Sequence, residues 1–83
     1  MEIILTDHAK KDIESLDNKM KRRVYQKIDD LEKMKPNLNI RKLQGKHGDL
    51  RLKVGSYRIV HYISGDKVYV TNILPRKDVY KKI

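Results

Sequence analysis

With 83 residues, of which 39% are hydrophobic and 37% charged, the chain is long enough for a single domain spanning residues 1–83 with a small core. Its 20 Lys and Arg residues against 11 Asp and Glu residues give a formal charge of +9, so we expect an anionic partner such as nucleic acid, a membrane surface or an acidic protein. The absence of cysteine excludes disulfide bonds, thiolate zinc sites and a cysteine nucleophile.

The first third of the chain predicts a short strand followed by two helices. Residues 2–5 are expected to form the strand, and the apolar run around Ile3–Leu5 is too short for a signal peptide or a membrane span, so we expect a cytoplasmic protein without a membrane partner. Thr6 is a suitable N-cap for the first helix, and Asp17-Asn18 indicates the break before the second. We expect Pro36 to end the second helix, because the residue before a proline disfavours the α region. The apolar positions of this antiparallel helical hairpin are Ala9, Ile13, Leu16, Met20, Val24, Ile28, Leu31 and Met34.

The outer face of the helical hairpin mixes basic and acidic residues. Such a pattern is typical of a solvated helix face, and we prefer that interpretation. Only the run Lys19–Arg23 has few acidic neighbours, so phosphate binding remains an alternative there.

The stretch from Leu50 to Tyr62 predicts a β-hairpin with a basic surface. Apolar and cationic residues alternate over Leu50–Val54, which is the pattern of a strand with one buried face. Gly55 and Ser56 interrupt the pattern, and Tyr57–Ile63 predicts the second strand. Pairing of these strands would bring three cations to one sheet surface: Arg51, Lys53 and Arg58. Such a cluster repels itself, and a phosphate partner explains it best.

The rest of the chain completes an α+β fold. Ser64-Gly65-Asp66 indicates a hairpin turn, and the nearly uncharged segment Lys67–Leu74 is expected to form a central strand. Pro75 ends that strand, and Arg76–Ile83 is expected to be a short basic helix or arm. We therefore predict an N-terminal strand and helical hairpin that cover one face of an antiparallel sheet, with the other face open and basic.

Three segments carry a resemblance to a known family: KLQG at Lys42–Gly45, LRLKVGSYRIVHY at Leu50–Tyr62 and ILPRKDVY at Ile73–Tyr80. Together with the two preceding helices, they resemble the RelE/ParE superfamily of bacterial and archaeal toxins over almost the whole chain. Its members are small basic toxins, each held inactive by an antitoxin encoded beside it. The RelE branch comprises ribosome-dependent endoribonucleases that cut messenger RNA in the decoding site. The ParE branch poisons DNA gyrase and generally lacks the basic and tyrosine residues of the RelE site.

The resemblance implies a role for each of five residues in RNA cleavage. Arg51 would grip the RNA backbone, and Lys53 would help to activate the attacking ribose 2′-hydroxyl. Arg58 would stabilise charge on the scissile phosphate, and Arg76 would protonate or stabilise the leaving 5′-oxygen. Tyr80 would stack on or orient a base beside the cut.

Further RNA contacts are expected from Lys42, Lys46 and Lys77. The chain also departs from the family pattern in two ways. It has Leu74-Pro75-Arg76 where the family often has Gly-His-Arg, and its spacing from Arg76 to Tyr80 is shorter than in some members.

The residues themselves favour cleavage without a metal or cofactor. The five candidate site residues include no carboxylate pair, no Ser-His-Asp arrangement and no metal-binding cluster, so we expect no cofactor. RNA supplies its own nucleophile, the 2′-hydroxyl, and the protein must align it and neutralise charge on the phosphorane. Arg51 and Arg58 would disfavour the charged form of Lys53, which makes the Lys53 amine the best candidate for the general base.

Each of these assignments has a structural alternative. Arg51 and Lys53 are also compatible with the solvent side of an edge strand, and Tyr80 with packing of the tail on the sheet. By alternation His61 lies opposite to Arg58, so we expect a half-buried structural histidine there. Core or cross-strand packing is expected for three tyrosines: Tyr57, Tyr62 and Tyr69.

These observations together predict an endoribonuclease toxin that cuts messenger RNA in the ribosomal decoding site and contacts ribosomal RNA. The charge of +9 suits an acidic cognate antitoxin that folds on binding. Three alternatives remain: a ParE-like inhibitor of DNA gyrase, a catalytically inactive binding member, and a plain RNA-binding module.

Overall fold

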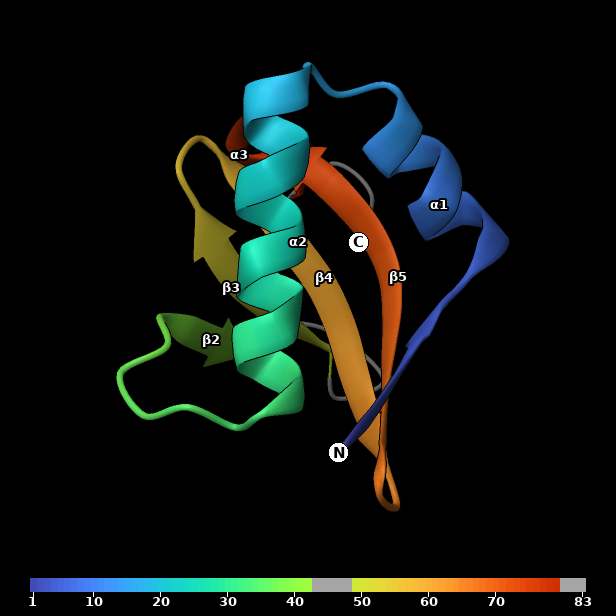
Figure 1. The fold of residues 1–83 in the computed structure, drawn as a ribbon, viewed down its shortest axis with the longest axis vertical. Helices are drawn as coiled ribbons and strands as arrows, with labels where there is room; N and C mark the ends of the chain where they lie inside the picture. Colours follow the sequence, from blue (N-terminus) through green and yellow to red (C-terminus); the bar gives the residue numbers. More distant parts are fainter. Residues whose placement is uncertain (43–48, 80–83) are drawn as a thin grey trace.

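The computed structural model describes residues 1–42 and 49–79 and has the predicted α+β architecture (Figure 1). Five strands form one sheet, and three helices pack on it. In chain order the elements are β1 (Glu2–Leu5), α1 (Asp7–Glu14), α2 (Asn18–Glu32), β2 (Ile40–Lys42), β3 (Leu50–Val54), β4 (Tyr57–Ser64), β5 (Lys67–Pro75) and α3 (Arg76–Val79). Among these helices, none has the length and apolar character that crossing a membrane requires.

The strands follow the order β1-β5-β4-β3-β2 across the sheet. The strands from β2 to β5 form an antiparallel meander, whereas β1 adds to the edge of β5 in the parallel direction. The nearly uncharged β5 thus lies between β1 and β4, which confirms the prediction that this segment is internal to the sheet. The chain between β1 and β5 contains α1, α2 and three strands, and this long connection allows the parallel pair, which a tight turn could not form.

Both long helices begin at side-chain caps, of which the sequence predicts that of Thr6. The Thr6 hydroxyl accepts a hydrogen bond from the backbone N–H of Ala9 at 3.2 Å. The Asp17 carboxylate accepts one from the N–H of Met20 at 2.7 Å, so the predicted break between the helices is the N-cap of α2. Each cap satisfies a backbone donor that has no partner within its own helix.

The C-terminal end of α2 differs from the prediction. The helix ends at Glu32, four residues before Pro36, because Met34 adopts the left-handed conformation with φ of 52°. The N–H of Met34 then donates to the carbonyl of Leu31, and that of Lys35 to the carbonyl of Asp30, both at 3.1 Å. This pattern is a Schellman motif, in which glycine is the usual left-handed residue. Met34 is therefore not on the buried stripe of the helix and is 64% exposed.

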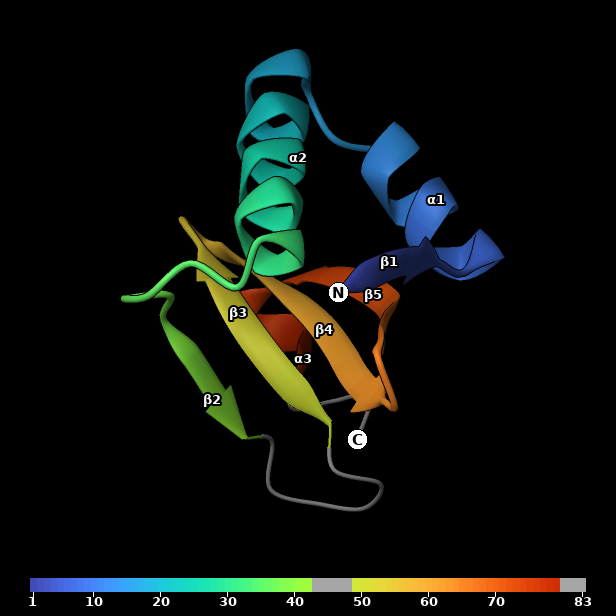
Figure 2. The same cartoon turned by 60° about the horizontal axis from the view of Figure 1, so that its bottom comes forward.

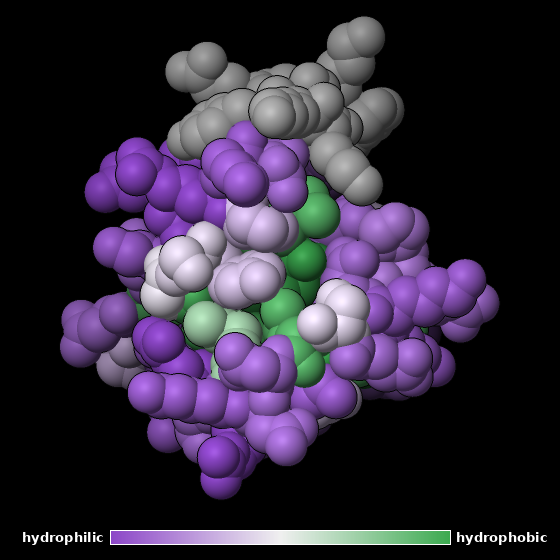
Figure 3. All heavy atoms as spheres, turned by 90° about the horizontal axis from the view of Figure 1, so that it is seen from above, coloured by the Kyte–Doolittle hydropathy of each residue, from purple (hydrophilic) through white to green (hydrophobic). Residues whose placement is uncertain are grey.

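The main core lies between the two long helices and one face of the sheet. Figure 2 shows α1 and α2 on the same side of the sheet, with α3 on the opposite side. In the predicted stripe Met20 is only partly buried and Met34 is exposed, whereas the other six residues are buried: Ala9, Ile13, Leu16, Val24, Ile28 and Leu31. They pack against strand residues that share a face: Leu52, Val54, Ile59, Val68, Val70 and Ile73. On the face seen from above, hydrophilic side chains surround a smaller exposed hydrophobic area (Figure 3).

The second face of the sheet is only partly open. Val79 of α3 is fully buried against Val60 and Leu74, and these three residues form a separate apolar cluster. The prediction of an entirely open basic face is therefore wrong at this end of the sheet. The cover is short because α3 supplies a single buried side chain.

Candidate functional site

Two cross-strand pairs of like charge lie side by side on the second face of the sheet. Arg41 of β2 is directly opposite Arg51 of β3, and Lys53 of β3 is directly opposite Arg58 of β4. Like charges in directly opposed positions destabilise a sheet, so packing alone does not account for this arrangement. The predicted convergence of Arg51, Lys53 and Arg58 on one surface is thus what the register of the strands produces.

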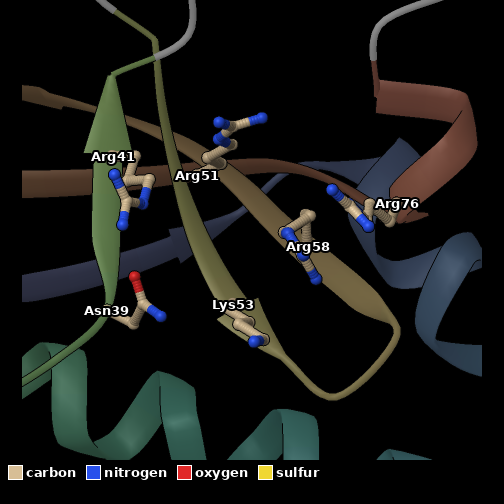
Figure 4. Close-up of a pocket in the computed structure, with 6 residues that line it drawn as sticks. All are labelled: Asn39, Arg41, Arg51, Lys53, Arg58 and Arg76. Atoms are coloured by element: carbon tan, nitrogen blue, oxygen red, sulfur yellow. The ribbon is translucent and has the colours of Figure 1, made fainter.

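These side chains line a cavity of about 290 Å³ (Figure 4). The described residues that line it are Asn39, Arg41, Arg51, Lys53, Arg58 and Arg76. Five of the six are cationic, and they come from β2, β3, β4 and the start of α3. Figure 4 shows Arg58 near the middle of the group, with Arg76 on one side and the β2 residues on the other. The cavity is therefore suited to a polyanion that spans several strands.

Arg58 is held by the turn that it follows. Its Nη1 donates to the carbonyl oxygen of Gly55 at 3.0 Å and to that of Tyr57 at 2.8 Å. Gly55 has φ of +59°, a conformation that favours glycine and that turns its carbonyl toward this donor. The turn is also covered from the helix side, since a Cβ at Gly55 would lie 2.9 Å from Nη1 of Arg23. The guanidinium of Arg58 is thus oriented before any ligand arrives.

Arg76 reaches the cavity through a backbone contact with the same turn. Its N–H donates to the carbonyl of Ser56 at 2.8 Å, immediately after Pro75 pairs with Tyr57 at the end of β5. This hydrogen bond ties the start of α3 to the β3–β4 turn. Four predicted residues are accordingly brought together by the structure: Arg51, Lys53, Arg58 and Arg76.

Other predicted site residues lie elsewhere or outside the described residues. Lys42 pairs with Leu50 on the face of the sheet opposite to Arg41, so the structure does not bring it to the cavity. Lys77 is exposed beside a neighbouring hollow that shares Arg76 with the cavity. Lys46 and Tyr80 fall outside the described ranges, as do three of the four residues of the KLQG segment.

Sequence reasoning missed two residues of the cavity, Asn39 and Arg41. Both belong to the segment after Pro36, where the sequence predicts only a short strand or an extended arm. Alternation around Ile40, which faces the core, places its two neighbours on the opposite face. The apolar Ile40 between Asn39 and Arg41 was therefore the available signal that these two residues share a face. Only the pairing of β2 with β3 shows that this face is that of the cavity.

His61 is more deeply buried than expected. It is 0% exposed, and its Nδ1 lies 3.0 Å from the carbonyl oxygen of Ile59 on the same strand. Burial lowers the pKa of His61 below the ordinary value of 6.5, and this effect outweighs the opposing ones of the Ile59 carbonyl and of Asp49. His61 belongs to the core, as predicted, and takes no part in the cavity.

Two of the tyrosines form the cross-strand pair expected of them. Tyr62 of β4 and Tyr69 of β5 are directly opposite, with ring centroids 4.9 Å apart and an interplanar angle of 13°. Tyr57 packs against the main core. These three rings stabilise the sheet.

The chemistry of the cavity follows from its side chains. Arginine guanidinium groups bind phosphate oxygens through paired donors and stay charged, whereas a lysine amine can exchange a proton. The described lining residues are five cations and one amide. The site is thus equipped to hold a phosphate group and to stabilise negative charge that develops on it.

Comparison with known proteins identifies the family. A family model described as "ParE toxin of type II toxin-antitoxin system, parDE" matches residues 3–80. The curated protein Toxin RelE3 of Methanocaldococcus jannaschii is 26% identical over 84 residues, which cover 96% of each chain.

Solved structures of similar fold include toxins alone and in complexes. The RelB-RelE antitoxin-toxin complex from Methanococcus jannaschii contains a chain that is 23% identical, with a TM-score of 0.76 and coverage of 96% of this chain and 98% of that one. The isolated RelE toxin of E. coli is 20% identical, with a TM-score of 0.73 and coverage of 98% and 92%. From the match over residues 3–80, the chain belongs to the RelE/ParE superfamily of type II toxin–antitoxin toxins.

Proposed function

We propose that this toxin is an endoribonuclease that cleaves messenger RNA presented in the ribosomal decoding site. The observation that supports this proposal best is the cavity, in which five cationic side chains converge on one sheet face. Phosphate is the ligand that relieves the repulsion between the opposed pairs Arg41/Arg51 and Lys53/Arg58. The resemblance of the sequence motifs to the RelE branch adds to this argument, because it implies roles in RNA cleavage for the four predicted residues of the cavity.

The proposed reaction needs only the RNA and these side chains. The neutral amine of Lys53 takes the proton of a ribose 2′-hydroxyl, and the 2′-oxygen attacks the adjacent phosphorus. The bond from phosphorus to the 5′-oxygen breaks, which leaves a 2′,3′-cyclic phosphate and a 5′-hydroxyl end. Arg58 stabilises the phosphorane charge and Arg76 stabilises the leaving oxygen, which takes its proton from water, since a guanidinium does not give up its own. Arg51 and Arg41 hold the neighbouring backbone phosphates.

We further propose that a cognate acidic antitoxin neutralises the toxin by folding on its surface. Similar chains from Methanococcus jannaschii, Pyrococcus horikoshii and Mycobacterium tuberculosis occur in toxin-antitoxin complexes. This chain offers the complementary features, a charge of +9 and exposed apolar side chains at Met34 and Ile63. Both line an apolar hollow of about 230 Å³ beside the end of α2, which suits the apolar side chains of a folding segment.

Inhibition of DNA gyrase is the competing function, since the matching family model carries the ParE description. A protein inhibitor of that kind needs a docking surface but no set of groups around a scissile phosphate. The convergence of Lys53, Arg58 and Arg76 on one cavity favours the nuclease over this alternative and over an inactive binding member.

Brief expression of the toxin, followed by mapping of new 5′ ends in cellular messenger RNA, tests the proposal. We expect breaks inside translated codons, and we expect Arg58→Ala to reduce them by about 10²- to 10³-fold, the effect of removing one transition-state donor. Lys10→Ala is the control, because Lys10 is an exposed cation of α1 that lies outside both the cavity and the run Lys19–Arg23. Circular dichroism establishes that both variants fold.

Each alternative predicts another outcome of this experiment. Growth arrest with DNA breaks and intact messenger RNA would establish gyrase inhibition and contradict the nuclease. Intact messenger RNA without arrest would establish an inactive binding member. Breaks that persist at the full rate in Arg58→Ala would remove Arg58 from the chemistry.

A further inference from the structure

Asn39 differs in kind from every other described residue of the cavity. The remaining five are cations, which are suited to phosphate wherever it occurs in a nucleic acid and, among bases, to the acceptor edge of guanine. An amide side chain is uncharged and presents a donor beside an acceptor, the pattern that distinguishes one base edge from another. Among the described residues of the cavity, Asn39 alone presents the donor and acceptor pair that matches adenine.

The backbone fixes Asn39 beside the proposed general base. Its carbonyl accepts a hydrogen bond from the N–H of Lys53 at 3.1 Å, which continues the β2–β3 ladder by one residue past Ile40. Asn39, Lys53 and Arg58 thus form one row across three neighbouring chain segments. Adjacent segments of a sheet are about 4.8 Å apart, so the backbone of Asn39 lies one strand spacing from the backbone of Lys53.

The side chain of Asn39 is directed into the cavity. Figure 4 shows its amide on the β2 side of the cavity, pointing across β3 toward Lys53. The residue is exposed, so its amide is accessible to a ligand. A ribose with its 2′-hydroxyl at Lys53 would carry its base within reach of this amide.

We propose that Asn39 determines base specificity at the nucleotide that precedes the cut, by forming two hydrogen bonds with the edge of that base. This inference depends on the proposed ribonuclease function. The amide oxygen accepts from an exocyclic amine and the amide nitrogen donates to a ring nitrogen. Adenine offers this pair at N6 and N7, and it is accessible in unstacked single-stranded RNA.

The test compares the base frequencies at mapped cleavage sites for the wild-type toxin and for Asn39→Ala. We expect the wild type to favour adenine before the cut and Asn39→Ala to lower that preference by about tenfold, the effect of one lost bidentate contact, because breaks that follow adenine become rarer while breaks that follow other bases are retained. Asn39→Gln keeps the amide on a longer arm and should retain part of the preference.

Asn37→Gly is the matched control. It removes an amide from the same connection, and glycine suits the φ of 70° at that position. The control should keep the wild-type base frequencies. Base frequencies that are equal in the wild type and Asn39→Ala would overturn the proposal for Asn39 while leaving the nuclease intact. The absence of breaks in the wild type itself would instead overturn the proposed function.

Discussion

At the scale of single residues, two cationic groups of different chemistry lie side by side, the amine of Lys53 and the guanidinium of Arg58. Arg58 on one side is fixed by two backbone carbonyls of the turn, whereas Lys53 is exposed in the cavity between Arg58 and Asn39. A guanidinium stays charged and stabilises phosphate, whereas an amine is the one of these two groups that can exchange a proton. The proposed base, Lys53, and the proposed phosphate-binding residue, Arg58, are therefore adjacent but chemically distinct.

The replacement Lys53→Arg distinguishes proton transfer from charge stabilisation at this position. Arginine keeps the positive charge but cannot act as the base, so we expect the rate of cleavage on ribosomes to fall by about 10²-fold or more, as in Lys53→Ala. Single-turnover cleavage of ribosome-bound messenger RNA measures the rate. Binding of a 2′-deoxy-substituted message serves as the control and should be nearly unchanged in Lys53→Arg. If that variant cleaves at the wild-type rate, Lys53 contributes charge alone.

At the scale of elements, the short edge strand β2 determines the extent of the cationic surface. It contributes three residues, yet its pairing with β3 adds Arg41 to the cavity and continues to Asn39. Because side chains alternate along a strand, the neighbouring cation Lys42 lies on the other face. Adjacent residues of equal charge thus have different environments.

This alternation predicts different effects of two adjacent substitutions on RNA binding. The logarithm of the binding constant for single-stranded nucleic acid falls with the logarithm of salt concentration by about 0.7 for each neutralised phosphate. We expect Arg41→Ala to reduce this slope by about 0.7, since one phosphate contact is lost, and Lys42→Ala to leave it unchanged. Titration of a 2′-deoxy oligonucleotide at several salt concentrations measures both. Equal slopes for the two variants would contradict the placement of Arg41 at the ligand.

At the scale of the whole molecule, the two faces of the sheet have separate tasks. One face packs against α1 and α2 and forms the main core, which includes the fully buried His61 on the strand side. The other face carries the cavity, with α3 covering only the cluster of Val60, Leu74 and Val79. Mutual repulsion in the cavity must be offset by the packing of this small core.

His61 makes that core sensitive to pH. Its pKa in the folded protein is lowered by burial, so the unfolded chain binds the proton more readily than the native state does. The free energy of unfolding should therefore fall as the pH drops from 7 through 6.5, by at most about 1.4 kcal/mol per pH unit. We expect His61→Leu to flatten this dependence between pH 7 and 5.5 in urea titrations. His8→Gln replaces an exposed histidine and should keep the slope, and a slope retained in His61→Leu would assign the effect to other groups.

Most helices and strands and their buried faces could be predicted from the sequence, because they depend on local patterns. Caps at Thr6 and Asp17, the period of the helical stripe and the interruption at Gly55 act within a few residues of one another. The end of α2 escaped prediction since Met34 adopts a left-handed conformation that is usual for glycine. Pro36 correctly indicated that the helix ends nearby, but the Schellman motif at Met34 ends it earlier.

The full set of residues in the cavity became clear only from the pairing of strands in the folded protein. The cations of the β3–β4 hairpin could be predicted to converge, because a two-residue turn sets their register. The positions of Asn39 and Arg41 depend on the pairing of β2 with β3, and that of Arg76 on its hydrogen bond to Ser56. These contacts join segments that are distant in sequence, where no local pattern specifies the partner, and they depend on how the whole sheet assembles.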